Sequence, residues 1–135
     1  MVERITRQAM KPMLEPYGLC EAVAAGGLLH LSGQTGLDPE TGRVAPGGLR
    51  AQAKQAFRNI KEVIEAAGGG TANILSLTWY VVEGDQGRTF LDDAIAITAA
   101  REEVFPGLVA ASTAVRVKAL LTPDFLVEIA AVAAL

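Results

Sequence analysis

The chain has 135 residues, of which 50% are hydrophobic and 20% charged, and its formal net charge is −3 at pH 7. This composition predicts one domain over residues 1–135 with a substantial core, and it excludes an extensively disordered chain. The mixed, slightly acidic charge excludes a basic nucleic-acid surface, and no apolar run is long enough to cross a membrane. A single cysteine and the lack of a signal-like segment predict a cytoplasmic protein.

Short strands and turns are predicted in the first third of the chain. Residues 2–7 alternate enough to predict a strand, and two prolines within residues 11–17 predict a loop. Residues 19–25 and 28–32 predict two strands joined by Gly26-Gly27, a pair typical of tight hairpin turns. At residues 38–42, Asp-Pro-Glu-Thr-Gly predicts a turn, because proline fixes one φ angle and glycine closes the loop.

The strongest helix signal covers residues 49–67. Its apolar residues recur at helical spacing and form one stripe: Leu49, Ala53, Ala56, Phe57, Ile60, Val63, Ile64 and Ala67. The glycines at 68–70 follow this helix instead of preceding one, so they indicate a helix end and not a phosphate-binding loop. A second helix is predicted over residues 88–105.

The remaining segments predict strands at residues 74–83, 111–120 and 125–134. The strand at 74–83 has two different faces, one with Leu75, Leu77, Trp79 and Val81 and the other with Ser76, Thr78, Tyr80 and Val82. Two helices and about six strands cannot cover both faces of a sheet. We therefore expect an oligomer in which the second face meets a neighbouring subunit.

Residues that commonly catalyse reactions are sparse. With one histidine and one cysteine, the chain lacks the ligands for a zinc or iron site, so we predict no metal and no cofactor. His30 is interpreted as a half-buried structural residue, although in a cleft its ordinary pKa would suit proton transfer. Cys20 is interpreted as a small buried residue, the alternative being a nucleophile with His30 as its base.

An ordered set of motifs gives a more specific indication. They are Pro16-Tyr17, Ser32-Gly33-Gln34, the turn at 38–42, Gln55–Asn59, Glu65–Gly68, Phe105–Gly107 and Leu126–Ile129. In this order they resemble the reactive intermediate deaminase family, also called RidA or YjgF. The resemblance implies an α+β fold with a mixed, mainly antiparallel six-stranded sheet and two helices on one face, as in chorismate mutase-like proteins. It also implies a homotrimer that binds small molecules at its subunit interfaces.

The same resemblance implies a ligand-binding cleft formed by Tyr17, Ser32, Gly33, Ser112 and Glu128. Two family residues are absent: Ser112 stands in place of an arginine that holds the substrate carboxylate, and Ala130 in place of a glutamate that positions water. Arginine suits the first task because it is a permanently charged, bidentate donor. Glu128 reaches a bound water only if the ligand lies deeper in the cleft. The favoured interpretation is an ion pair with Lys118 or Arg116 across the last two strands.

Two hypotheses of function follow from the resemblance. The first is an enzyme that hydrolyses an enamine, an imine or another sp² carbon in a ligand without the usual carboxylate. The second is a non-catalytic ligand-binding or regulatory trimer that kept the fold and the interface cleft. RNA cleavage, which is also attached to the family, is ranked last because the chain is acidic and has no basic aromatic face.

Overall fold

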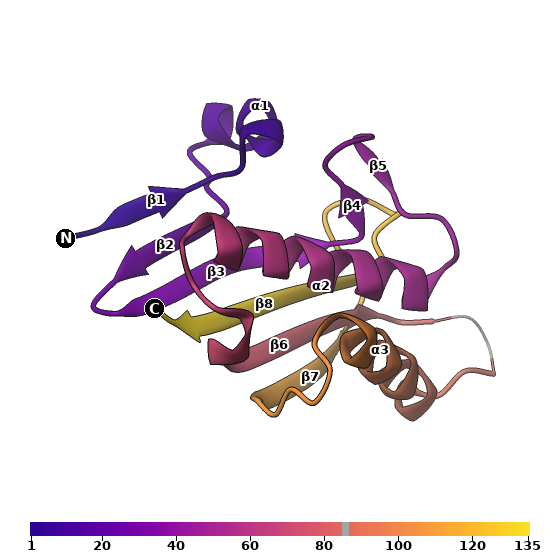
Figure 1. Ribbon diagram of the computed structural model, residues 1–135. Helices are drawn as coiled ribbons and strands as arrows, with labels where there is room; N and C mark the ends of the chain where they lie inside the picture. Colours follow the sequence, from indigo (N-terminus) through magenta and orange to yellow (C-terminus); the bar gives the residue numbers. More distant parts are fainter. Residues whose placement is uncertain (85–86) are drawn as a thin grey trace.

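A six-stranded sheet forms the centre of the molecule, and two long helices cover one of its faces (Figure 1). The computed structural model describes residues 1–84 and 87–135. The strands lie in the order β1-β2-β3-β8-β6-β7, and all neighbouring pairs are antiparallel except β6 and β7. Their bounds are β1 Glu3–Ile5, β2 Ala22–Ala25, β3 Leu28–Thr35, β6 Ile74–Val82, β7 Ala111–Val117 and β8 Val127–Ala134. The predicted α+β class with a mixed, mainly antiparallel sheet is confirmed.

Helix α2, Leu49–Ala66, packs on β3 and β8 through the predicted apolar stripe. Phe57, Ile60 and Ile64 are fully buried there. The helix ends as predicted, because Gly68 adopts a φ of 80° and its N–H donates to the Glu65 carbonyl. Removing these side chains from water supplies much of the free energy that holds the helix on the sheet.

Helix α3, Phe90–Val104, lies beside α2 on the same face of the sheet (Figure 1). The Thr89 side chain accepts from the Asp92 N–H, and the Asp92 carboxylate accepts from the Thr89 N–H, so a capping box opens the helix. Asp93 is buried and forms ion pairs of 2.6 Å with Arg88 and Arg116. The Arg116 pair ties α3 to the outer strand β7.

The predicted hairpin and turn are both present. Gly26 and Gly27 have φ angles of 59° and 78°, as a tight turn between β2 and β3 requires. At residues 38–42 the Gly42 N–H donates to the Asp38 carbonyl at 2.9 Å. That turn joins two strands that were not predicted, β4 Leu37–Asp38 and β5 Arg43–Val44, which form a separate two-stranded sheet.

The predicted loop at residues 11–17 is wrong. The segment is helical, with 3₁₀ turns at Gln8–Met10 and Glu15–Tyr17 on either side of α1, Lys11–Leu14. Both prolines stand in the first turn of a helical piece, where the missing N–H breaks no internal hydrogen bond. They therefore begin short helices instead of preventing them.

The two faces of β6 differ as predicted from Leu77 onward. Leu77, Trp79 and Val81 are buried under the helices, with exposures of 1%, 6% and 0%. Leu75 was predicted on this face but is 47% exposed, because the pairing register with β8 shifts between Ile74 and Ser76. The opposite face carries half-buried side chains, and no helix of the described residues covers it (Figure 1).

Candidate functional site

A β-bulge interrupts β3 at Ser32 and Gly33. The strand pairs Leu31 with Ala131 and then Gln34 with Ile129, so β3 contains one residue more than β8 between these two pairs. Both bulge residues are exposed, whereas Leu31 and Gln34 on either side are buried. Such bulges redirect side chains and main chain locally, often next to functional sites.

Gly33 leaves the space that the Glu128 side chain occupies. A Cβ at position 33 would lie 2.7 Å from the Glu128 carboxyl carbon and from one of its oxygens. Glu128 sits on β8 opposite Thr35 of β3 and Tyr80 of β6. Glycine is needed here for the close approach of a carboxylate, and not for an unusual backbone angle.

A cavity of about 630 Å³ opens beside this pair, between the N-terminal helical segment, the bulge and the start of β8. Four of the five residues that the resemblance implies for the ligand site line it: Tyr17, Ser32, Gly33 and Glu128. Ser32 donates its hydroxyl proton to the Cys20 carbonyl at 2.7 Å. We call this space the Glu128 cavity. Its walls are largely apolar, and the Glu128 carboxylate is part of its lining.

Glu128 has no cationic partner among residues 1–84 and 87–135. Its burial raises the pKa of its carboxyl group above the ordinary glutamate value, because the charged form is poorly solvated there. The predicted pairing with Lys118 or Arg116 is wrong. Strand β6 separates β7 from β8, and Arg116 instead contacts Asp93 and the Val82 carbonyl.

Ser112 lies outside the Glu128 cavity. It sits on the outer strand β7, in register with Leu77, and donates its hydroxyl proton to the Ala110 carbonyl at 3.1 Å. Leu77 faces the helices, whereas Glu128 is half-buried on the opposite face of the sheet. A single protomer therefore does not bring Ser112 and Glu128 together.

Cys20 and His30 do not form a nucleophile–base pair. Cys20 is half-buried at the cavity wall and contacts Ser32, whereas His30 pairs with Val23 and Val132 further along the sheet. His30 is exposed, so the prediction that it is half-buried is wrong for the protomer. It projects from the face of the sheet that the helices leave open.

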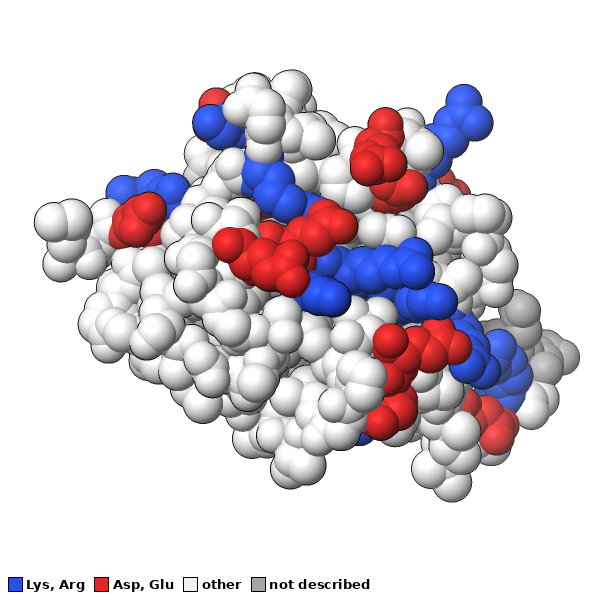
Figure 2. Space-filling model, in the orientation of Figure 1, with Lys and Arg blue, Asp and Glu red and all other residues white. Residues whose placement is uncertain are grey.

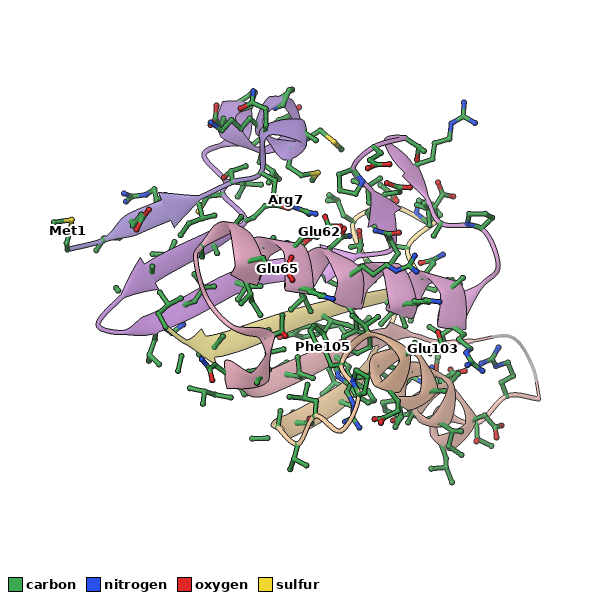
Figure 3. The ribbon with its side chains drawn as sticks, in the orientation of Figure 1. Met1, Arg7, Glu62, Glu65, Glu103 and Phe105 are labelled. Atoms are coloured by element: carbon green, nitrogen blue, oxygen red, sulfur yellow. The ribbon has the colours of Figure 1, made fainter. Side chains whose placement is uncertain are left out.

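Arg7 and Glu21 form the polar wall of the cavity, and neither was singled out from the sequence. Three Arg7 groups, the main-chain N–H, Nε and Nη2, donate to the buried Glu21 carboxylate at 3.0, 2.9 and 2.6 Å. Arg7 Nη1 also reaches Glu62 on α2 at 2.6 Å (Figure 3). Burial opposes the arginine charge, but the two carboxylates outweigh it and raise its pKa. The Arg7 charge is therefore fully engaged.

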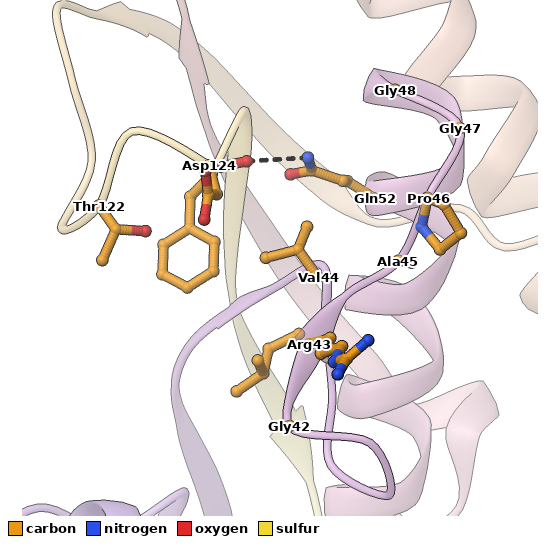
Figure 4. Close-up of a pocket in the computed structure, with 12 residues that line it drawn as sticks. Gly42, Arg43, Val44, Ala45, Pro46, Gly47, Gly48, Gln52, Thr122 and Asp124 are labelled. Atoms are coloured by element: carbon orange, nitrogen blue, oxygen red, sulfur yellow. Dashed lines mark hydrogen bonds between the residues drawn. The ribbon is translucent and has the colours of Figure 1, made fainter.

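Gln52 and Asn59 of α2 form hydrogen bonds with main-chain segments next to the Glu128 cavity. Gln52 donates to the Asp124 carbonyl and accepts from the Leu126 N–H, both at 2.9 Å, which fixes the chain just before β8 (Figure 4). Asn59 donates to the Thr35 carbonyl and to a second carbonyl beyond it, which fixes the end of β3. A second cavity, shown in Figure 4, is lined by Gln52 and Asp124 together with the glycines at 47–48.

Charged side chains of both signs share the face of the molecule that carries the two long helices. On the face with α2 and α3, Lys and Arg side chains lie among Asp and Glu (Figure 2), and Glu103 pairs with both Arg50 and Lys54. In the described part of the chain, no group of three or more His, Cys, Asp or Glu residues could hold a metal ion. The helices described there include none long and apolar enough to cross a membrane.

Two known proteins are similar to this chain over most of its length. A RutC family protein of Pyrococcus horikoshii is 33% identical over 128 residues, which is 95% of this chain and 93% of that protein. A 2-iminobutanoate/2-iminopropanoate deaminase of Capra hircus is 33% identical over 121 residues, or 89% of this chain and 82% of that protein.

A solved structure shares the fold over its whole length. It is a protein of unknown function of the Rid family from Yersinia pestis, with a TM-score of 0.82, 25% identity and 100% of both chains covered. Residues 7–135 also match the family described as Endoribonuclease L-PSP. The chain therefore belongs to this family, to which the RidA and YjgF names also apply.

Proposed function

We propose that this protein hydrolyses small imines or enamines that carry no carboxylate next to the reacting carbon. The observation that carries the proposal is the half-buried Glu128 carboxylate beside the bulge at Gly33, which has no cationic partner within residues 1–84 and 87–135. A raised pKa brings a carboxylate closer to the working pH of a general base. The deaminase name of the Capra hircus relative supports the same reaction type.

The proposed reaction needs one water molecule and one group that moves a proton. Glu128 accepts a proton from water while the water oxygen bonds to the imine carbon, and the C=N π electrons move to nitrogen. The protonated Glu128 then returns the proton to nitrogen, which gives a neutral carbinolamine from a neutral imine and an ammonium-bearing carbinolamine from a protonated imine. Loss of ammonia from the carbinolamine forms the carbonyl, so imine and water become a carbonyl compound and ammonia. General-base catalysis of this kind contributes about a hundredfold or more.

Two substitutions support a substrate without a carboxylate. Ser112 cannot replace the bidentate arginine of the family deaminases, and Ala130 supplies no second carboxylate. Each such contact contributes on the order of 2–4 kcal/mol of transition-state stabilisation. We therefore expect ordinary imino acids to be poor substrates, and we expect Glu128 alone to activate water.

The same substitutions favour a second candidate, a non-catalytic ligand-binding or regulatory trimer. In that case the Glu128 cavity binds a ligand, and the rate of imine hydrolysis does not change when protein is added. The two candidates share one site and differ only in turnover.

We also propose an oligomeric state and a cellular location for the protein. The open sheet face carries Thr78, Tyr80 and Val132 half-buried in an isolated protomer, which supports burial against another subunit. The family resemblance supports a trimer, with residues 1–135 as one domain and the ligand sites at the interfaces. The single cysteine supports a cytoplasmic location.

The test measures hydrolysis of an imine made in the cuvette by an amine oxidase acting on 2-phenylethylamine. We expect the protein to accelerate aldehyde release and the E128Q variant to lose about a hundredfold of that acceleration. The E65Q variant removes an equal charge from an exposed position on α2 and should match the wild type. Equal rates for wild type and E128Q would contradict the proposal, and no acceleration with retained ligand binding would favour the regulatory candidate.

A further inference from the structure

The Glu128 cavity contains one uncompensated charge. Three charged residues line it, and two of them, Arg7 and Glu21, are bonded to each other. Arg7 also pairs with Glu62, so its positive charge faces two carboxylates. Glu128 has no such partner within the described residues, and the net charge that a ligand meets is therefore negative.

Two polar side chains at the cavity already donate to main-chain carbonyls. The Ser32 hydroxyl donates to the Cys20 carbonyl, and the Asn59 amide donates to the carbonyls that end β3 and begin β4. An incoming carboxylate would meet the like charge of Glu128 and no uncommitted cationic donor among the lining residues. Like charges at short range in a partly desolvated site oppose binding strongly.

The remaining walls are apolar and partly uncovered. Leu121 is 90% exposed, and Tyr17 is 78% exposed. Apolar side chains from the N-terminal helical segment and from the β7–β8 connection complete the wall: Met10, Met13, Leu14, Leu19, Leu121 and Phe125. A ligand with an apolar substituent would remove this surface from water, which favours binding.

We infer that the Glu128 cavity binds a small organic cation, a primary ammonium or a protonated imine, with an apolar group against the wall of Met13 and Phe125. The inference rests on the proposed function for the identity of the site. It adds that the substrate is held in its positively charged form and that carboxylates are rejected. The cation compensates Glu128, and the apolar group covers the side chains that the protomer leaves exposed.

The experiment compares two probes of matched shape in calorimetric titrations of the intact protein. 2-Phenylethylamine is cationic and 3-phenylpropanoate is anionic, and both carry a phenyl ring on a two-carbon chain. We expect the amine to bind roughly tenfold or more tightly than the carboxylate. The E128Q variant should lose this preference, and the E65Q variant should keep it.

The inference is overturned by a carboxylate that binds as tightly as the amine, or by an amine preference that survives in E128Q. Absence of binding by either probe would overturn it as well. Turnover separates this result from the proposed function. If the protein prefers the amine but does not hydrolyse imines, the proposed enzyme activity is contradicted and the cation site is supported. If hydrolysis depends on Glu128 but carboxylates bind more tightly than amines, the cation site is contradicted and the enzyme activity is supported.

Discussion

The two faces of β8 differ in what covers them. Val127, Ile129 and Ala133 are fully buried against the helix layer, whereas Glu128 and Ala130, which alternate with them, are half-buried on the other face. The covered face packs apolar side chains and admits no charge. The open face carries a carboxylate, a bulge and a cavity. Along one strand, every second residue serves stability and the residues between them are available for binding and chemistry.

The largest expected effect is a loss of stability caused by a substitution on the covered face of the sheet. Leu77→Asp places a charge where the exposure is 1%, and we expect it to destabilise the protein by about 4 kcal/mol or more. The neighbouring Thr78→Asp points to the open face and should leave the protomer folded while it weakens assembly. Urea denaturation and sedimentation measure the two effects. A normally folded L77D protein would contradict the assignment of the two faces.

The second prediction concerns a variant that restores the two missing family residues, one at Ala130 on the open face of β8 and one at Ser112 on the outer strand β7. We expect Ser112→Arg with Ala130→Glu to raise hydrolysis of 2-iminopropanoate about a hundredfold. The gain should exceed the product of the gains of the single variants, since both groups act on one bound substrate. Ser112 and Glu128 lie apart in one protomer, so this coupling needs a site shared between subunits. The rate of keto-acid release measures the gain of each variant. If the gain of the double variant in a folded trimer equals the product of the two single gains, a shared site is contradicted.

The third prediction fills the space beside Glu128. Gly33→Ala puts a Cβ within 2.7 Å of the Glu128 carboxyl group, which must move. We expect imine hydrolysis and amine binding to fall about tenfold, equivalent to about 1.4 kcal/mol, with a smaller loss of stability. Gly70→Ala is the control, because its Cβ would make only an ordinary contact of 3.5 Å. Equal losses in the two variants would show that the close approach has no functional role.

The smallest effect is on stability and pH. Burial raises the pKa of Glu128 in the folded protein, so the native state binds more protons than the unfolded state between the ordinary and the raised value. Stability therefore falls as pH rises through that window. E128Q removes the penalty, and we expect it to exceed the wild type by about 0.5 kcal/mol at pH 7 after allowance for solvent screening. Urea denaturation at pH 7 and pH 4 tests this, and a destabilised variant at pH 7 would refute it.

Local patterns predicted the elements well. The apolar stripe of α2 and the Gly26-Gly27 hairpin depend on neighbouring residues in sequence, and both are present. Errors arose where local signals are ambiguous. The prolines at residues 11–17 predict a loop, although a proline in the first turn of a helix is compatible with that helix and begins one here. The register shift in β6 displaced Leu75 without any sequence signal.

The site depended on contacts between distant segments, which periodicity does not give. The predicted ion pair between Glu128 and a residue of β7 requires that strands consecutive in sequence be neighbours in the sheet. The actual order inserts β6 between them. The Arg7–Glu21 bridge joins residues 14 apart in sequence across a helical segment that was predicted as a loop. Only the family resemblance drew attention to Tyr17, Ser32, Gly33 and Glu128 together.

The central claim is that Glu128 is an unpaired, partly desolvated carboxylate facing a ligand cavity. The most direct measurement is an NMR titration of its side-chain carboxyl carbon, assigned by comparison with E128Q. We expect a pKa above the ordinary glutamate value, and a fall in that pKa when 2-phenylethylamine is added. An ordinary or lowered pKa that does not respond to the amine would show that Glu128 is solvated or already paired, and would contradict both the proposed chemistry and the cation site.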